Sequence, residues 1–213
     1  MVGLIVATQL LGKGEQTRER ILAIAEGMVL RQGFTATGID AIIAEAGITK
    51  NGFFYHFRDK NELAQALLVR FMDHDDAIFD ELAGRADALI EDPLHAFLAF
   101  LKLFAQVMAD LPERHPGCLV ASYCYQDQFF SREVRELSQD IVRGWRRRFR
   151  ARLDAISVRY PPRTPVDLDA LADLVVTLVE GGIILDKVRR DHRTLPRQVM
   201  LARSLIQMVF EPA

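Results

Sequence analysis

The feature that most constrains the fold is the spacing of apolar residues, which recurs every three to four positions along most of the chain. Between Glu15 and Gly33, for example, the apolar residues at positions 21, 22, 25, 28 and 29 would share one face of a helix. We find no alternating pattern long enough for a half-buried strand. The sequence therefore predicts an all-α protein with about nine helices.

Two short helices are predicted after this first one, on the basis of their boundary residues. Thr37 is a favourable N-cap for a helix that Gly47 would end. Thr49 can cap the next helix, in which Phe53 and Phe57 fall four residues apart on one face. Two short helices joined through the turn "AGIT" match the helix-turn-helix pattern, whose second helix enters the major groove of DNA.

The side of this second helix opposite the phenylalanines carries groups suited to DNA. The polar or small residues on it and just beyond it are Lys50, Asn51, Gly52, Tyr55, His56 and Lys60. Gly52 would allow close approach, and Asn51 could pair with an adenine edge. Lys50, Tyr55 and His56 can donate hydrogen bonds to phosphate, with the charge of Lys60 beside them.

The charge balance indicates that any contact with nucleic acid is local. The whole chain of 213 residues has a formal net charge of −2, unlike a protein that coats nucleic acid. Residues 49–60 carry Lys50, Arg58 and Lys60 against the single acid Asp59. Because this excess is modest, we expect affinity for DNA to depend on two copies of the domain acting together.

The rest of the chain is predicted to form a larger helical domain, so that residues 1–62 and 63–213 are the expected domains. Asp59 is a plausible N-cap for a long helix that continues to about Gly84. Further helices are expected at 93–108, 118–130, 131–156, 168–185 and 195–210. The last two are apolar on most sides and must be buried on most sides. We therefore expect a homodimer formed through the helices at about 166–190 and 194–210.

Other clusters of polar and aromatic residues have plainer interpretations. The stretch "MDHDD" at residues 72–76 and the arginines of "WRRRFRAR" at 145–152 are interpreted as solvated helix faces. We see no nucleotide-binding glycine pattern, metal-ligand spacing or activated nucleophile, so we expect no enzyme activity, metal or cofactor. Phe104, Tyr123 and Trp145 are candidates for lining an apolar ligand pocket, although such aromatic residues are more often part of the core.

Two features bear on where the protein works. Cys118 and Cys124 are too few for a disulfide framework, which favours a reducing, cytoplasmic setting; they could be small apolar residues or redox sensors. The apolar run from Val2 to Leu11 is too short to span a membrane and lacks the features of a secretory signal. It is interpreted as an extra N-terminal helix or a misassigned start.

The stretch "TATGIDAIIAEAGITKNGFFYHFRDKNEL", residues 35–63, resembles the DNA-binding signature of the tetracycline-repressor (TetR) family of bacterial transcription regulators. The resemblance implies a homodimer that binds a palindromic operator and holds a small-molecule effector in its C-terminal domain. Base and phosphate contacts are implied at the positions of Thr37, Thr49, Lys50, Asn51, Gly52, Tyr55, His56 and Lys60. Phe54 departs from the family's usual tyrosine, and Asn51 from its common glycine.

These observations together predict a ligand-responsive regulator, most simply a repressor that its effector releases from DNA. Two alternatives remain open at the level of sequence. An all-α enzyme would need converging polar groups in the C-terminal domain. A protein-interaction module that reuses the helix-turn-helix would be indifferent to DNA.

Overall fold

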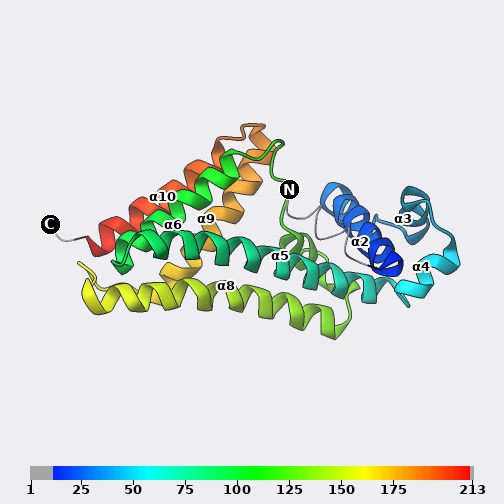
Figure 1. Ribbon diagram of the computed structural model, residues 1–213, viewed down its shortest axis with the longest axis horizontal. Helices are drawn as coiled ribbons and strands as arrows, with labels where there is room; N and C mark the ends of the chain where they lie inside the picture. Colours follow the sequence, from blue (N-terminus) through cyan, green and yellow to red (C-terminus); the bar gives the residue numbers. More distant parts are fainter. Residues whose placement is uncertain (1–11, 212–213) are drawn as a thin grey trace. The chain divides into compact units, whose positions relative to one another are not determined.

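The computed structural model describes residues 12–211, so the apolar stretch at residues 2–11 lies outside the described part. This part contains nine α-helices, one 3-10 helix and no strand, which confirms the all-α prediction (Figure 1). The α-helices are α2 (Lys13–Gln32), α3 (Ile39–Ala46), α4 (Lys50–His56), α5 (Lys60–Leu89), α6 (Pro93–Ala109), α7 (Leu119–Cys124), α8 (Arg132–Arg159), α9 (Leu168–Arg189) and α10 (Thr194–Phe210). Across residues 12–211, no helix is both long enough and apolar enough to cross a membrane.

The chain divides into two compact units. The first contains the chain up to Met72 together with Cys118–Ser138. The second contains Asp73–Gly117 and the chain from Gln139 onward. Helices α5 and α8 therefore contribute residues to both units. The domain boundary predicted after residue 62 was drawn between two expected functions and does not coincide with the limits of these compact units. It stays a prediction.

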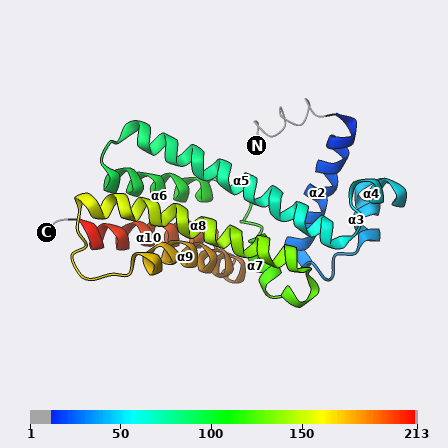
Figure 2. The same cartoon turned by 90° about the horizontal axis from the view of Figure 1, so that it is seen from below.

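In the first unit α3 lies beside α2, and α4 lies beside α3 (Figure 2). Helix α2 turns four apolar residues inward: Ile21, Leu22, Ala25 and Val29. Phe53 and Phe57 are almost completely buried, and their ring centroids are 5.6 Å apart. Burial of a phenylalanine stabilises a fold by about 1.5 to 3 kcal/mol, so these two rings are a substantial anchor for the short helix α4.

The single helix predicted at residues 118–130 is wrong, because the structure has α7 followed by the 3-10 helix η1 (Asp127–Phe129). The break serves the packing of Tyr123 and Phe130, whose rings stack with centroids 4.3 Å apart. Seven residues of continuous helix would separate them by about 10 Å along the axis. Both rings also pack on Phe34, at 5.3 Å and 4.6 Å.

The second unit has α10 packed against both α6 and α9 (Figure 1). Pro93 begins α6 as predicted, and the side chain of Asp92 caps this helix by accepting the His95 N–H at 3.0 Å. The core includes five phenylalanine rings in mutual contact: Phe79, Phe97, Phe100, Phe104 and Phe149. Helix α5 continues to Leu89 instead of ending near Gly84, because Ala86 is still buried on its inner face.

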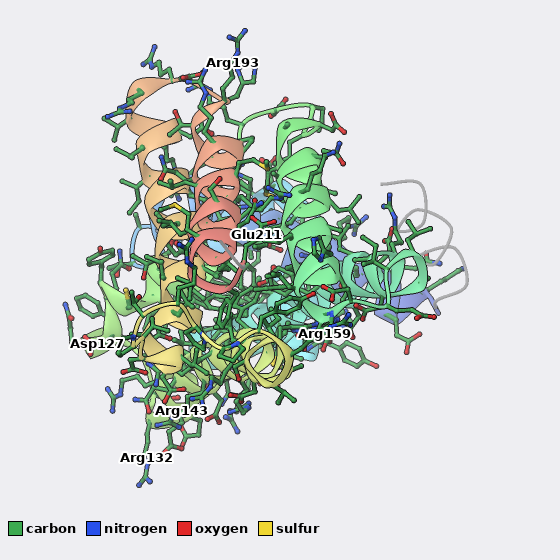
Figure 3. The ribbon with its side chains drawn as sticks, turned by 90° about the vertical axis from the view of Figure 1, so that its left-hand side faces the viewer. Asp127, Arg132, Arg143, Arg159, Arg193 and Glu211 are labelled. Atoms are coloured by element: carbon green, nitrogen blue, oxygen red, sulfur yellow. The ribbon has the colours of Figure 1, made fainter. Side chains whose placement is uncertain are left out.

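Four of the five arginines of the "WRRRFRAR" stretch are paired with carboxylates instead of being only solvated, whereas Arg147 is exposed, as predicted. Their partners come from other helices or from the next turn of α8: Arg146 with Asp173, Arg148 with Asp76 and Asp80, Arg150 with Asp154 and Asp169, and Arg152 with Asp87. By contrast, Arg193 at the start of α10 is exposed and projects away from the helices (Figure 3). The paired arginines have little capacity left for a second nucleic-acid surface.

Asp75 contradicts the prediction that the whole "MDHDD" stretch is a solvated face. Its side chain is largely buried, and it accepts a hydrogen bond from Nε1 of Trp145 at 3.1 Å. Burial raises the pKa of Asp75 to about 6, and the charges of Asp76 and Glu180 act in the same direction. Consecutive residues on a helix point in different directions around its axis. Asp75 therefore faces Trp145, while Asp73 and His74 face solvent.

Candidate nucleic-acid interface

The turn between α3 and α4 has the geometry that its sequence predicts. Gly47 ends α3 in the left-handed conformation, at φ +62°, which glycine adopts without a steric penalty. The Ile48 N–H then bonds to the Ile43 carbonyl at 3.2 Å. Thr49 caps α4 as predicted, with Oγ1 accepting the Gly52 N–H at 3.1 Å. The turn therefore orients α4 with respect to α3.

Helix α4 has one buried and one exposed side. Phe53 is fully buried, whereas Lys50 and Asn51 are exposed and Tyr55 has 82% of its surface exposed. Phe54, at the position where the family usually has tyrosine, is 42% exposed. The anchored helix therefore presents a mixed polar and aromatic surface outward, as the sequence predicted.

Gly52 has a structural role beside the predicted close approach to DNA. A Cβ at this position would lie 3.3 Å from Thr49 Oγ1, which is a tight contact with the atom that caps the helix. A side chain at this position would therefore crowd the cap. The sequence argument considered only the approach of DNA.

The prediction that Thr37 is the N-cap of α3 is wrong. The residue before the helix is Gly38, and no side chain caps this end. Thr37 is 1% exposed, and its hydroxyl donates to the Gly33 carbonyl at 2.8 Å. This hydrogen bond joins two residues of the loop between α2 and α3, because the preceding turn brings the Gly33 carbonyl within reach of the Thr37 hydroxyl.

Lys60 is held against the same loop. Its Nζ donates to the carbonyls of Phe34 at 2.7 Å and Thr35 at 3.3 Å, and lies 4.5 Å from the centre of the Phe34 ring. Burial lowers the pKa of this ammonium below its ordinary value. An ammonium has three donors, so one remains for a phosphate after these two bonds.

His56 lies at the C-terminal end of α4, with its ring edge-on to that of Tyr55 at 4.9 Å. Partial burial, and then the nearby charge of Arg18, lower the pKa of the imidazole. His56 is therefore mostly neutral at pH 7 in the free protein. Its neutral ring can donate one hydrogen bond, through a single N–H.

Gln126 and Asn61 are polar residues near this site that the sequence argument did not identify. Gln126 Oε1 accepts the Thr35 N–H at 3.0 Å, and Asn61 Oδ1 accepts the Ser131 N–H at 3.0 Å. Both bonds join residues 70 or more positions apart. No local pattern signals such pairs, because they depend on the packing of α7 and η1.

The three predicted pocket residues are not brought together in one unit. Tyr123 belongs to the first unit, where it packs on Phe34 and its hydroxyl donates to the Ala64 carbonyl at 3.5 Å. Phe104 and Trp145 belong to the second, where they are 6% and 8% exposed. The contacts of Tyr123 favour a role in the core of the first unit.

An exposed, anchored second helix behind a glycine turn defines the class of helix-turn-helix DNA-binding proteins. Two family descriptions match this chain: "Bacterial regulatory proteins, tetR family" over residues 21–67, and "Transcriptional regulator LmrA/YxaF-like, C-terminal domain" over residues 93–199. The chain belongs to the TetR family of bacterial transcriptional regulators. This chain is a ligand-responsive DNA-binding transcriptional regulator. The family to which it belongs is not enzymatic.

Individual relatives agree with this assignment. The HTH-type transcriptional regulator YxaF of Bacillus subtilis is 26% identical over 181 residues, which are 84% of this chain and 89% of YxaF. The HTH-type transcriptional repressor NemR of Escherichia coli is 37% identical over 54 residues, 25% of this chain and 27% of NemR. A TetR regulator from Chloroflexus aurantiacus superposes with a TM-score of 0.74 at 26% identity, covering 94% of this chain and 99% of that one.

Proposed function

We propose that this regulator is a cytoplasmic repressor that binds a palindromic operator as a homodimer and is released by a small-molecule effector. Residues 1–62 would bind DNA, and residues 63–213 would bind the effector and form the dimer. The protein would have no catalytic role of its own. The similarity to the transcriptional repressor NemR, over 54 residues at 37% identity, supports repression.

The observation that carries the proposal is the outward surface of α4. Lys50, Asn51 and Tyr55 are exposed while Phe53 locks the opposite side of the helix into the core. A recognition helix needs this division, because a side chain that reads a base must be held by a rigid scaffold and still reach the groove.

The exposed groups divide by chemistry into base and phosphate contacts. Asn51 can make a bidentate pair with adenine, and Gly52 lets the backbone approach the groove wall. Lys50, Tyr55 and His56 can donate to phosphate. Thr49, whose oxygen accepts from Gly52, can still donate its hydroxyl proton, and Lys60 retains its third donor. Thr37 has no donor left for DNA in this conformation, because its buried hydroxyl donates to the Gly33 carbonyl and its N–H donates to the Phe34 carbonyl.

The proposed dimer interface lies on α9 and α10. Both helices leave large apolar side chains exposed: Ile184 at 52%, Val188 at 76%, Leu201 at 44% and Met208 at 67%. A two-fold axis would pair these helices with their copies and remove the apolar surface from water. Two recognition helices could then reach successive major grooves about 34 to 36 Å apart.

The effector is proposed to bind among the aromatic residues of the second unit, near Phe104 and Trp145. Release requires only that the effector prefer a conformation in which the two recognition helices have the wrong separation. A coupling free energy of about 1 to 3 kcal/mol would weaken operator binding by about 5- to 150-fold.

The proposal is tested by gel-shift titration with the intergenic DNA beside the gene, at a stated salt concentration. Asn51→Ala should change the preferred sequence, with a loss of about 1 to 3 kcal/mol in discrimination at one base pair of each half-site. Lys50→Ala should weaken binding to all sequences and reduce the slope of log K against log salt by about 0.9 per half-site.

Two results would contradict this scheme. If wild-type protein showed no sequence-selective binding, repression would be refuted, and tight binding to another protein would then favour an interaction module. If Asn51→Ala and Lys50→Ala had the same effect on every sequence, the division between base and phosphate contacts would be wrong.

A further inference from the structure

We propose that Gln126 is a positioning residue for operator binding, through its hold on the loop of residues 33–37 that leads into α3. This inference rests on the proposed DNA-binding function and extends it to a segment far from the helix-turn-helix in sequence. Gln126 itself would not touch DNA. It would act through Thr35 and through the helix that begins four residues later.

The hold consists of two hydrogen bonds at one acceptor. Gln126 Oε1 accepts the Thr35 backbone N–H at 3.0 Å and the Thr35 hydroxyl at 2.8 Å. The first bond restrains the backbone of the loop, and the second restrains the side chain of the same residue. Residue 126 therefore needs only an acceptor oxygen to make both bonds, because Thr35 supplies both donors.

The amide of Gln126 also lies close to the backbone of Gly33. Gly33 has φ +85°, a conformation that residues with a side chain rarely adopt. A Cβ at this position would lie 2.9 Å from Nε2 of Gln126. Glycine at position 33 therefore serves the turn and lets the Gln126 side chain approach the loop.

Other bonds restrain the same loop from inside the first unit. Thr37 Oγ1 donates to the Gly33 carbonyl at 2.8 Å, and the Thr37 N–H donates to the Phe34 carbonyl at 3.1 Å. Lys60 Nζ bonds the carbonyls of Phe34 and Thr35. These bonds occupy three successive loop carbonyls, whereas Gln126 supplies the acceptor for the Thr35 N–H.

Gln126 can act as a rigid support because its own segment is anchored on both sides. Before it, Tyr123 is 1% exposed and stacks on the ring of Phe130. After it, the N–H of Ser131 is bonded to Asn61 Oδ1 at 3.0 Å. Residues 123–131 are therefore held in place within the first unit, and the Gln126 side chain extends from this segment to the loop.

The loop matters for DNA because it sets where α3 begins, and α3 sets the turn and α4. Loss of the two bonds would let the loop sample positions in which α4 is not oriented for the groove. Apparent affinity falls in proportion to the population of the competent conformation. Both bonds are exposed, so water can replace the lost acceptor, and we take their combined effect as that of one weak neutral hydrogen bond. This corresponds to about a threefold effect per domain, and so to about a tenfold effect for a dimer.

The test compares full-length Gln126→Ala, Gln126→Glu and Gln128→Ala with wild type, on the operator fragment found by gel shift. Gln128 is the matched control, because it is an exposed glutamine in η1, two positions after Gln126. We expect Gln126→Ala to bind about tenfold more weakly, and Gln126→Glu, which keeps the acceptor, to bind within about twofold of wild type. Gln128→Ala should match wild type.

Amide hydrogen exchange at Thr35 separates positioning from general destabilisation. Gln126→Ala should raise the exchange rate at Thr35 while the unfolding midpoint of the protein stays within a few degrees of wild type. Weak binding that is accompanied by a large fall in the midpoint would overturn the positioning role. Equal affinity of Gln126→Ala and wild type, or a Gln126→Glu variant as weak as Gln126→Ala, would also overturn it.

The failure of this inference differs from the failure of the proposed function. Wild-type protein that binds no operator would refute both the repressor function and the role of Gln126 in it. Wild-type binding with an unaffected Gln126→Ala variant would refute the role of Gln126 alone.

Discussion

Replacement of Asp75 by asparagine should stabilise the protein above pH 6, because it removes a buried charge and keeps an oxygen that can accept the Trp145 hydrogen bond. The carboxylate is largely buried beside Trp145, and its pKa is raised to about 6. The pKa of an aspartate in the unfolded chain is about 3.9. The native state therefore binds the proton more tightly than the unfolded state between these two values.

The sign of the effect follows from this difference. Stability that comes from a protonated Asp75 is fully present below about pH 4 and is lost as the pH rises through about 6. At pH 8 the charged carboxylate costs at most about 3 kcal/mol, at 1.36 kcal/mol for each pH unit between the two pKa values. Relaxation and water penetration reduce the cost in real proteins, so we expect a gain of about 1 to 2 kcal/mol for Asp75→Asn.

The assay is urea unfolding of wild type and Asp75→Asn at pH 8, 6.5, 5 and 4, at one fixed protein concentration. The asparagine oxygen still accepts the Trp145 N–H, so the packing is preserved. Asp73→Asn is the control, because Asp73 is an exposed carboxylate two residues away on the same helix. A free energy of unfolding for Asp75→Asn that is lower than wild type at pH 8, or a difference that does not shrink toward pH 4, would refute the reasoning.

Two further predictions concern DNA binding and dimerisation. Burial and Arg18 lower the pKa of His56 in the free protein, and a bound phosphate would raise it. Operator affinity should therefore increase as the pH falls, and His56→Gln should reduce this dependence in gel shifts. A pH profile unchanged by the substitution would place His56 away from DNA. Ile184→Glu and Val188→Glu should shift the protein toward monomer in sedimentation velocity, because each would bury a charge in the proposed interface. The control Val158→Glu, at an 87% exposed position of α8, should not. Dimers that persist in the first two variants would exclude this face of α9 from the interface.

Several structural features were predictable because they depend on neighbouring residues only. The positions of Gly47 and Thr49 set the turn before α4, since one glycine conformation and one side-chain cap are local chemistry. The pairing of Phe53 with Phe57 follows from the spacing of a helix. These features led from sequence to the helix-turn-helix and to the family.

Other features were mispredicted because a competing partner lies outside the local stretch. Thr37 had the residue type of an N-cap, but its hydroxyl reaches the Gly33 carbonyl instead. Asp75 belonged to a polar run, but its position on the helix faces Trp145. In each case, the orientation of a side chain was decided by the packing of other elements and not by its neighbours in sequence.

The sequence by itself determined the all-α class, the helix-turn-helix and the residues that line the outer side of α4. These depend on periodicity, capping and glycine conformations, which act over a few residues. Only the tertiary structure decided that Lys60 is bound to the loop before α3 and that Gln126, 91 positions after Thr35, holds the same loop. Such contacts arise when the break after α7 folds Phe130 back onto Tyr123 and Phe34, and burial of these rings requires the whole first unit.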